Sequence, residues 1–302
     1  MVQIGVLSKN REYFPTNQLL KELDHRKNHS GIFLSTQYVS PIISNRNIDA
    51  IFADQSLKGI AGVIPRIGRT QTELGLFCLK QFELMGIPTT LSADALYLAR
   101  NKFRCFQALK SIPSLKIPTT LLISSAYMFE KIMTRFKFPV VIKIPNATRG
   151  MGTILAPNCR IAHEIVDALF IKNSSPVIIQ EYLKNTTRFE NTPSEDIRVL
   201  IVGKTVLGAM RRIASKGEWR TNFAQGAECI PYKLTSEEEE LAIKIVNRLG
   251  IEIAGIDLFP TDENVFVLEV NACPGWKAFE SANPHISVAK KILDYLETKI
   301  RL

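Results

Sequence analysis

The sequence predicts a mixed α/β protein, and three features of the chain support this fold class. Short apolar runs alternate with helical patterns over the first 90 residues, and the same alternation resumes after Pro118. In the last third of the chain, a long amphipathic helix precedes two strand-like runs separated by a short polar turn. Over the first 90 residues, alternation at this spacing is typical of a small α/β unit with a mainly parallel sheet.

The first unit extends to about Thr90. In chain order we expect a strand at 4–7, a helix at 16–23, strands at 31–34 and 60–64, a helix at 72–85 and a short run at 87–91. A long helical pattern then runs from Ser92 to Ala108. The hydroxyl of Ser92 is suited to cap its first turn.

The second unit follows Pro118 and repeats the alternation. We expect strands at 121–123, 140–144 and 177–180, with helices at 126–136 and 161–171. The polar stretch 184–194 is rich in Thr, Asn and Pro and is a candidate boundary. Beyond it we expect strands at 197–202 and 205–212 and a polar loop that continues to Gly226.

The pattern over 235–249 predicts a helix with defined ends. Thr235 and Glu238 form a capping box, and Gly250 supplies the C-terminal stop. The acidic run 237–240 is explained by the helix dipole, because carboxylates stabilise the N-terminal end of a helix. Its buried stripe is expected to comprise Leu241, Ile245, Val246 and Leu249.

The segment 251–272 carries the pattern that is most informative about function. Two strand-like runs flank the turn-forming residues 260–264, which predicts an antiparallel hairpin. Side chains alternate between the two faces of a strand, so the second run separates a core face from a polar face. We expect Phe266, Leu268 and Val270 on the core face, with Glu269 and Asn271 on the other.

A turn centred near Glu263 would place Asp257 directly opposite Glu269, with their Cβ atoms roughly 5 Å apart. Two carboxylates and the amide oxygen of Asn271 would then converge, and they would repel each other without a cation between them. Magnesium fits best, because it prefers hard oxygen ligands and completes its octahedron with water and nucleotide phosphates. An exposed polar strand face without an ion is the alternative.

Lys143 stands in an otherwise apolar strand. Burying a lysine is costly unless its ammonium group meets an anion, so this position favours a phosphate partner. Gly150 and Gly152 follow in a loop where the backbone can approach a ligand closely. The loop lacks the ending of a Walker motif, and a plain turn between strands would also explain it.

The run 180–183 ends a strand at the proposed hinge between the second and third units. Glu181 and the neighbouring backbone could bind the edge of an adenine, and a solvated strand end is the alternative. Arg211, Arg212 and Arg220 carry planar forks that suit phosphate oxygens. Surface ion pairs with acidic residues are the commoner role of such arginines.

The formal net charge of +9 favours acidic partners such as nucleotides, polyanionic substrates or nucleic acid. A solvated basic surface would give the same charge. Lysine and arginine are dispersed rather than clustered with aromatic residues, which weakens the nucleic-acid interpretation. The five cysteines show no C-x-x-C pair, which fits neither a zinc site nor a disulfide framework. Apolar runs of strand length and the lack of a signal-like start predict a cytoplasmic protein without a membrane span.

Seven motifs occur along the chain: VIPRIG at 63–68, ARNK at 99–102, VIK at 141–143, QEY at 180–182, DIR at 196–198, AGID at 254–257 and LEVNACPG at 268–275. In this order they resemble the ATP-grasp enzymes, specifically the RimK-like glutamate ligases. The resemblance implies an ATP-grasp fold with an N-terminal α/β pre-ATP-grasp domain (1–97), a central lid domain (98–184) and a C-terminal domain with the metal site (185–302). Nucleotide would bind between the last two.

The resemblance also implies residue roles. ATP would be bound by Lys102, Lys143, Gly150, Gly152, Glu181, Tyr182, Leu183, Asp196 and Arg211. Groups near the transferred phosphate would be Arg212, Arg220 and Asn222, which are the candidate catalytic residues. Asp257, Glu269 and Asn271 would hold Mg²⁺ or Mn²⁺, with two ions expected.

The activity implied is ATP-dependent ligation through an acyl phosphate, with release of ADP and phosphate. L-glutamate would be joined to an acidic acceptor, either a protein C-terminus or a coenzyme tail. Residues 186–194 and 276–279 depart from the ribosomal-protein-modifying form and leave the acceptor open. Ligation of other amino acids is one alternative, and a basic nucleic-acid-binding protein is an alternative of a different class. A ligase of this branch would use no nucleic acid as substrate and would resemble its family in forming a homo-oligomer.

Overall fold

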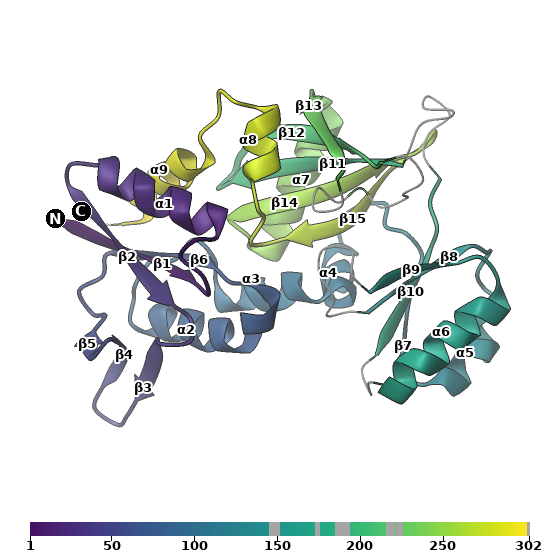
Figure 1. The fold of residues 1–302 in the computed structure, drawn as a ribbon, viewed down its shortest axis with the longest axis horizontal. Coiled ribbons are helices and arrows are strands. Elements are labelled where there is room, and N and C mark those ends of the chain that lie inside the picture. The colour runs from purple at the N-terminus through teal and green to yellow at the C-terminus, as the bar shows by residue number, and fades with distance from the viewer. Residues whose placement is uncertain (145–151, 173–175, 185–193, 216–220, 222–225, 301–302) are drawn as a thin grey trace.

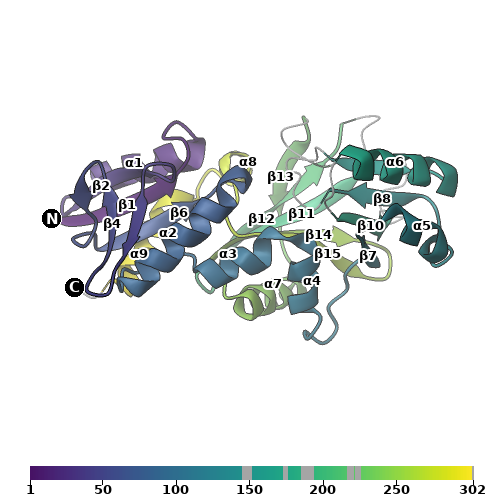
Figure 2. The same ribbon diagram turned by 90° about the horizontal axis from the view of Figure 1, so that it is seen from below.

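The computed structural model of the chain describes residues 1–144, 152–172, 176–184, 194–215, 221 and 226–300. Within these residues the strands form four sheets. Figures 1 and 2 show an elongated molecule with the N-terminal sheet at one end and the sheet of residues 120–181 at the other. The fold is mixed α/β, as the sequence predicts.

The N-terminal sheet is parallel, also as predicted. It comprises β1 (Val2–Ser8), β2 (His29–Ser35) and β6 (Gly62–Arg66) in the order β2-β1-β6. Helix α1 (Phe14–His25) forms the crossover between β1 and β2. Buried Ile4, Val6 and Leu7 on the central strand anchor this sheet in the core.

A small antiparallel sheet between β2 and β6 was not predicted. It contains β3 (Ser40–Ile43), β4 (Ile48–Phe52) and β5 (Gln55–Ser56). Every residue of β3 is exposed, so the strand lacks the apolar alternation that identifies a half-buried strand in sequence. The 3-10 turn η1 (Arg69–Gln71) and helix α2 (Thr72–Leu84) follow β6. Gln81 of α2 donates to the carbonyl of Ile42 at 2.9 Å.

The single long helix expected after Ser92 is wrong, because two helices occupy this stretch. Helix α3 (Ala93–Arg100) is capped by Ser92 as predicted, and α4 (Lys102–Leu109) follows it directly. Asn101 between them is extended, with φ −106° and ψ 116°. Its Oδ1 accepts hydrogen bonds from the backbone of Phe103 and Arg104, at 3.0 and 3.1 Å. The break places Lys102 at the first position of a new helix.

An antiparallel sheet forms the far end of the molecule in Figure 1. Strands β7 (Thr120–Ile123), β8 (Val140–Lys143), β9 (Thr153–Ala156) and β10 (Val177–Glu181) have the order β7-β10-β8-β9. Helices α5 (Ala126–Met133) and α6 (Cys159–Lys172) pack on it around Phe129 and Val166. We refer to these elements as the lid. Strand β9 was not predicted, since its residues were assigned to no element.

The largest sheet has the order β13-β12-β11-β14-β15 and is antiparallel throughout. Its strands are β11 (Glu195–Val202), β12 (Thr205–Ile213), β13 (Glu228–Tyr232), β14 (Ile253–Pro260) and β15 (Val265–Asn271). Helix α7 (Ser236–Leu249) packs with α3 and α4, while α8 (Lys277–Ala282) and α9 (Val288–Lys299) contact β11 to β13. Strand β13 and helices α8 and α9 were not predicted.

Helix α7 has the ends that the sequence predicts. The capping box between Thr235 and Glu238 is complete, and Gly250 ends the helix with a left-handed φ of 64°. The buried stripe differs by one residue, because Ala242 is buried while Leu241 is partly exposed.

The two ends of the chain pack together. Arg26 at the end of α1 contacts Asp294 at 2.6 Å and also pairs with Glu297, both on α9. Ile4, Leu19 and Leu293 belong to one buried cluster. Helix α9 therefore completes the core of the N-terminal sheet. None of the helices in the described ranges combines the length and apolar composition that a membrane-spanning helix requires.

Candidate active site

The hairpin of β14 and β15 has the predicted register at its polar residues. Asp257 lies directly opposite Glu269. A bulge follows, because Leu258 pairs with Val267 and leaves Leu268 as the extra residue. The bulge shifts the alternation, so the predicted core face is partly wrong.

The residues buried on this part of β15 are Val267 and Val270, which are 0% and 3% exposed. Phe266 and Leu268, which were expected in the core, are only half-buried. The polar assignment of Glu269 and Asn271 is unaffected by this shift, because both lie beyond the bulge.

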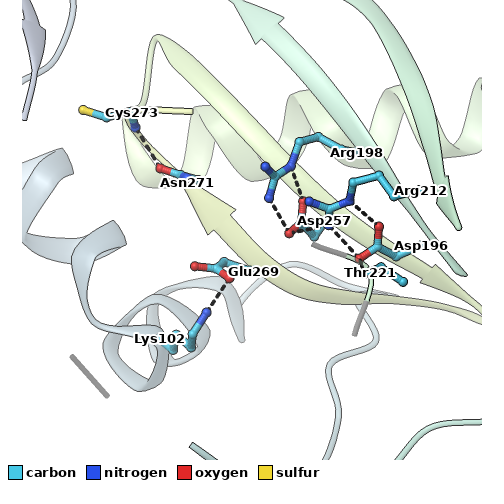
Figure 3. Close-up of polar contacts among 9 residues, drawn as sticks. All are labelled: Lys102, Asp196, Arg198, Arg212, Thr221, Asp257, Glu269, Asn271 and Cys273. Carbon is cyan, nitrogen blue, oxygen red and sulfur yellow. Dashed lines mark hydrogen bonds and ion pairs between the residues drawn. The ribbon is translucent and has the colours of Figure 1, made fainter. Parts of the chain in front are cut away.

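Polar residues on four neighbouring strands form a continuous row across the sheet. Arg212 on β12 lies opposite Asp196 on β11, and Arg198 on β11 lies opposite Asp257 on β14. Glu269 on β15 then continues the row from Asp257. Directly opposed residues share a face of a sheet, so these five side chains lie on one face. We call them the charged row (Figure 3).

Bidentate ion pairs connect most of the charged row. Arg198 donates from Nε and Nη2 to the two carboxylate oxygens of Asp257, both at 2.7 Å. Arg212 donates in the same way to Asp196 at 2.6 Å, and its Nη2 lies 2.9 Å from Asp257. Thr221 also donates to Asp196. Because Asp196, Arg212 and Asp257 are at most 5% exposed, each of them depends on its partners for charge compensation.

The arginines determine the charge state of Asp257. Burial by itself raises the pKa of a carboxyl group, but Arg198 and Arg212 hold the pKa of Asp257 well below its ordinary value. Burial likewise opposes the charge of Arg212, while Asp196 and Asp257 raise its pKa above the ordinary value. Asp257 is therefore an anion, and Arg212 is its fixed counter-ion.

Glu269 pairs with a different cation. Nζ of Lys102 lies 2.5 Å from its Oε2, and Nη2 of Arg69 lies 4.0 Å from its Oε1. Burial opposes the charge of Glu269, but Lys102 lowers its pKa below the ordinary value. Figure 3 shows Lys102 reaching Glu269 from α4, away from the arginines that hold Asp257. The residue expected to bind phosphate thus contacts the residue expected to bind metal.

Lys143 lies at the end of β8, on the lid. Its Nζ donates to Oε1 of Gln180, whose amide nitrogen donates to Thr120 at 2.8 Å. Burial, with the positive charge of Lys102, lowers the pKa of Lys143 to about 7, although Glu269 and Asp257 oppose this shift. The lid lysine therefore lies within electrostatic reach of both candidate metal ligands.

The other expected adenine and loop residues lie near the base of the lid. Oε1 of Glu181 accepts a hydrogen bond from the backbone of Thr119 at 2.8 Å, and Tyr182 and Leu183 follow directly after β10. Gly152 has φ of 75°, which a residue with a side chain rarely adopts, and its carbonyl accepts from Ile144 at 3.0 Å.

The remaining candidates divide into two groups. Arg211 lies 2.9 Å from the buried Glu195, and Oδ1 of Asn271 accepts from the backbone of Cys273 at 3.0 Å. Gly150, Arg220 and Asn222 fall outside the residues that the structure describes.

Two family models cover almost all of this chain. Residues 2–96 match the RimK PreATP-grasp domain, and residues 99–296 match the RimK-like ATP-grasp domain. The chain belongs to the RimK-like ATP-grasp family. The predicted family and fold are therefore confirmed, and the protein is an ATP-dependent ligase.

Relatives of this RimK-like chain match along its whole length. A probable alpha-L-glutamate ligase from Nitrosococcus oceani is 31% identical and covers 98% of this chain and 95% of its own. Another probable alpha-L-glutamate ligase, from Trichodesmium erythraeum, is 29% identical and covers 99% of this chain and 97% of its own. The structure of the ATP-grasp ligase PsnB with its minimal precursor has a TM-score of 0.74 at 17% identity, covering 100% and 99%. A second PsnB structure, with minimal precursor, Mg and ADP, has a TM-score of 0.71.

Two residues that contact the proposed metal ligands of the RimK-like site were not among the predicted site residues. Arg198 binds Asp257, and Arg69 approaches Glu269. The D-x-R motif at 196–198 carried a signal for the first, because residues two apart in a strand share a face. Arg69 follows β6 in the distant pre-ATP-grasp domain, and local sequence gives no signal for that contact.

Two residues of the charged row, together with Asn271, offer this RimK-like chain hard oxygen ligands. Asp257 and Glu269 provide carboxylates, and Asn271 provides an amide oxygen. Within the described residues, no three His, Cys, Asp or Glu side chains form a metal-binding group. A cation here would therefore take its other ligands from water or nucleotide, which is the usual coordination of Mg²⁺. The donor types fit this ion, and Asp257 would bind it in exchange for one of its contacts with Arg198.

Proposed function

We propose that the protein joins the α-amine of L-glutamate to a carboxylate of an acidic acceptor, with ATP converted to ADP and phosphate. The full-length relatives named as probable alpha-L-glutamate ligases support the choice of amino acid. The net charge of +9 is consistent with anionic substrates. The family assignment favours this ligase over the nucleic-acid-binding alternative.

The observation that carries the proposal is the position of Asp257 opposite Glu269, with Lys102 on one side and the lid residue Lys143 within electrostatic reach. In this proposal the two carboxylates hold the metal and the two lysines hold phosphate. Phosphoryl transfer requires such a site, because catalysis depends on positioning and charge stabilisation.

The reaction would proceed in two steps. A carboxylate oxygen of the acceptor forms a bond to the terminal phosphorus of ATP, and ADP leaves. The glutamate amine then attacks the acyl carbon, phosphate leaves with the bonding electrons, and the amine loses a proton. Neither step requires a nucleophile from the protein.

The chain's own residues would hold these reactants. We propose that Lys102 and Lys143 bind the terminal phosphates, while Glu181 and the adjacent backbone hold adenine. Asp257, Glu269 and Asn271 would bind Mg²⁺, which supplies positive charge against the transferring phosphate. Arg212 is buried between Asp196 and Asp257, so we assign it the role of fixing Asp257 in place.

The acceptor is proposed to be a peptide or protein terminus. PsnB, which shares this fold, has been solved with a precursor peptide. The coenzyme tail expected as the other acceptor remains a prediction, as do the use of Mn²⁺, the presence of two ions and assembly as a homo-oligomer.

The test measures ADP release from ATP, Mg²⁺ and L-glutamate in the presence of acidic peptides and coenzyme analogues. Mass spectrometry should show stepwise addition of glutamyl residues, with one ADP formed for each. Glu269→Gln is the matched inactive control. AMP in place of ADP, or much faster incorporation of another amino acid, would contradict the proposal.

A further inference from the structure

A buried arginine is the last residue of strand β6 in the pre-ATP-grasp domain. Arg66, the last residue of β6, is 3% exposed. Its guanidinium group lies 4.7 Å from the centre of the Trp276 ring, and its Nη2 donates to the carbonyl of Pro274. Its Nε and Nη1 have no hydrogen-bond partner among the described residues. Burying unsatisfied donors of a charged group is costly, so these atoms call for an anion.

A second arginine has the same arrangement nearby. Arg100, at the end of α3, donates from Nη2 to the carbonyl of Ile67 at 2.7 Å, and its buried Nε also lacks a partner in the described part of the chain. Ile67 directly follows Arg66. Both guanidinium groups are therefore anchored at one edge by a backbone carbonyl, while other buried donors have no partner in the described part of the chain.

Positive charge exceeds negative charge around these arginines. Arg69 lies three residues after Arg66, and it shares the carboxylate of Glu269 with Lys102. Two cations thus share the one carboxylate of Glu269, and Arg66 and Arg100 have no carboxylate partner among the described residues. A bound carboxylate would supply the missing negative charge.

The arginines border the candidate active site on the side away from the lid. Pro274 and Trp276, the two residues that Arg66 contacts, follow directly after β15, which carries Glu269 and Asn271. Gly275 between them is exposed, so the turn reaches solvent. The hydroxyl of Tyr13 packs closely against Gly275, because a Cβ atom at this position would lie only 3.1 Å from it.

We propose that Arg66 and Arg100 bind the side-chain carboxylate of the amino acid that is joined, and so select L-glutamate over neutral amino acids. The inference rests on the proposed ligase function and adds its specificity-determining residues. A site with buried donors rejects an analogue that cannot satisfy them, because the donors are then left unpaired. L-glutamine has the shape of glutamate without the charge, and it is the analogue that this site excludes.

The test compares Arg66→Lys, Arg66→Met and Arg100→Met with wild-type enzyme. We expect the KM for L-glutamate to rise about 10- to 100-fold in the methionine variants, the loss expected for a charge-assisted hydrogen bond. In the same variants the preference for glutamate over glutamine should decrease, while the KM for ATP stays unchanged. Arg66→Lys should recover part of the affinity. Arg104→Met is the control, because this half-buried arginine packs on Tyr97 at 3.5 Å on the same pair of helices.

Direct binding separates this inference from the proposed function. Glutarate, a dicarboxylate without an amine, is titrated calorimetrically into each full-length protein with a non-hydrolysable ATP analogue. Binding by wild type that is lost in Arg100→Met supports the carboxylate site even if glutamate proves not to be the amino acid joined. Glutamate-dependent turnover with unchanged KM and unchanged glutamine discrimination in the folded variants would overturn the inference and leave the ligase function standing. If Arg66→Met does not fold, Arg66→Lys and Arg100→Met test the inference in its place.

Discussion

The ammonium group of Lys102 lies 2.5 Å from the carboxylate of Glu269, so a residue expected to bind phosphate pairs with a residue expected to bind metal. The protein's own cation thus neutralises Glu269 in this conformation. Binding of nucleotide and metal would exchange these partners, with Lys102 moving to a phosphate and Glu269 to the ion.

This exchange predicts opposite effects of Lys102→Met on two ligands. Affinity for an ATP analogue should fall about 10- to 100-fold, because a charge-assisted contact is lost. Affinity for Mn²⁺ without nucleotide should rise, because Glu269 loses its competing cation. Electron paramagnetic resonance of free Mn²⁺ measures the second effect. Lys110→Met, at an exposed position after α4, is the control, and equal Mn²⁺ binding in both variants would rule out the exchange.

Glu269→Gln should abolish turnover with little loss of stability. The Glu269 side chain is 34% exposed, so its ion pair with Lys102 contributes about 1 kcal/mol or less. Turnover at saturating Mg²⁺ and urea unfolding measure the two effects separately. A folded variant with near-normal turnover would contradict the assignment of Glu269 as a metal ligand.

Asp257→Asn should abolish turnover and also destabilise the fold, because Arg198 and Arg212 lose their shared anion. The pKa of Asp257 is depressed in the folded protein, so its contribution to stability is present above the ordinary value of about 4 and is lost as the pH falls. Urea unfolding at a series of acidic pH values should therefore show a smaller loss of stability in the variant than in wild type. An equal loss of stability with falling pH in wild type and in Asp257→Asn would show that the arginines do not hold Asp257 as an anion.

Nucleotide binding should depend on pH through Lys143. Its pKa is about 7 in this structure, and an adjacent phosphate would raise it, so binding takes up a proton above that pH. Affinity should then fall as the pH rises from about 7, by at most tenfold per pH unit. Calorimetry in buffers with different ionisation enthalpies counts the protons. The Lys143→Met variant measures the protons that the nucleotide itself takes up, and this number is subtracted. The same proton uptake in the variant and in wild type would exclude Lys143 as the source.

Arg212→Met should unfold much more easily than a surface arginine variant. The substitution leaves Asp196 and Asp257 buried without their common cation, which typically costs about 3–5 kcal/mol. Arg160→Met is the matched control, because Arg160 forms an exposed pair with Glu164 on α6 that contributes about 0.5 kcal/mol or less. Urea denaturation of both variants gives the comparison. Equal free energies of unfolding for the two variants would show that Arg212 does not stabilise the fold through Asp196 and Asp257.

Sequence patterns predicted the elements that are determined by residues close together in the chain. The ends of α7 follow from Thr235, Glu238 and Gly250, and the hairpin register follows from the length of its turn. The family motifs contain four of the five residues of the charged row, all except Arg212, and the roles of these residues are proposals.

What sequence could not predict depends on distant contacts. The helical pattern continues through Asn101, but Arg100 binds Ile67 and Lys102 binds Glu269, and these contacts favour a break between the two helices. The bulge at Leu268 has no local signal, because an apolar residue fits either face of the strand. Local patterns identify which residues carry charge, whereas tertiary packing determines which charges meet.

The packing of α9 against α1 has a consequence for synthesis on the ribosome. The N-terminal sheet is made well before Leu293 and Leu296, which complete its buried cluster, leave the exit tunnel. Until then one side of the nascent domain lacks its apolar cover and is exposed to chaperones and proteases. Premature termination before residue 288 would therefore damage a part of the molecule that is translated much earlier, far from the missing codons.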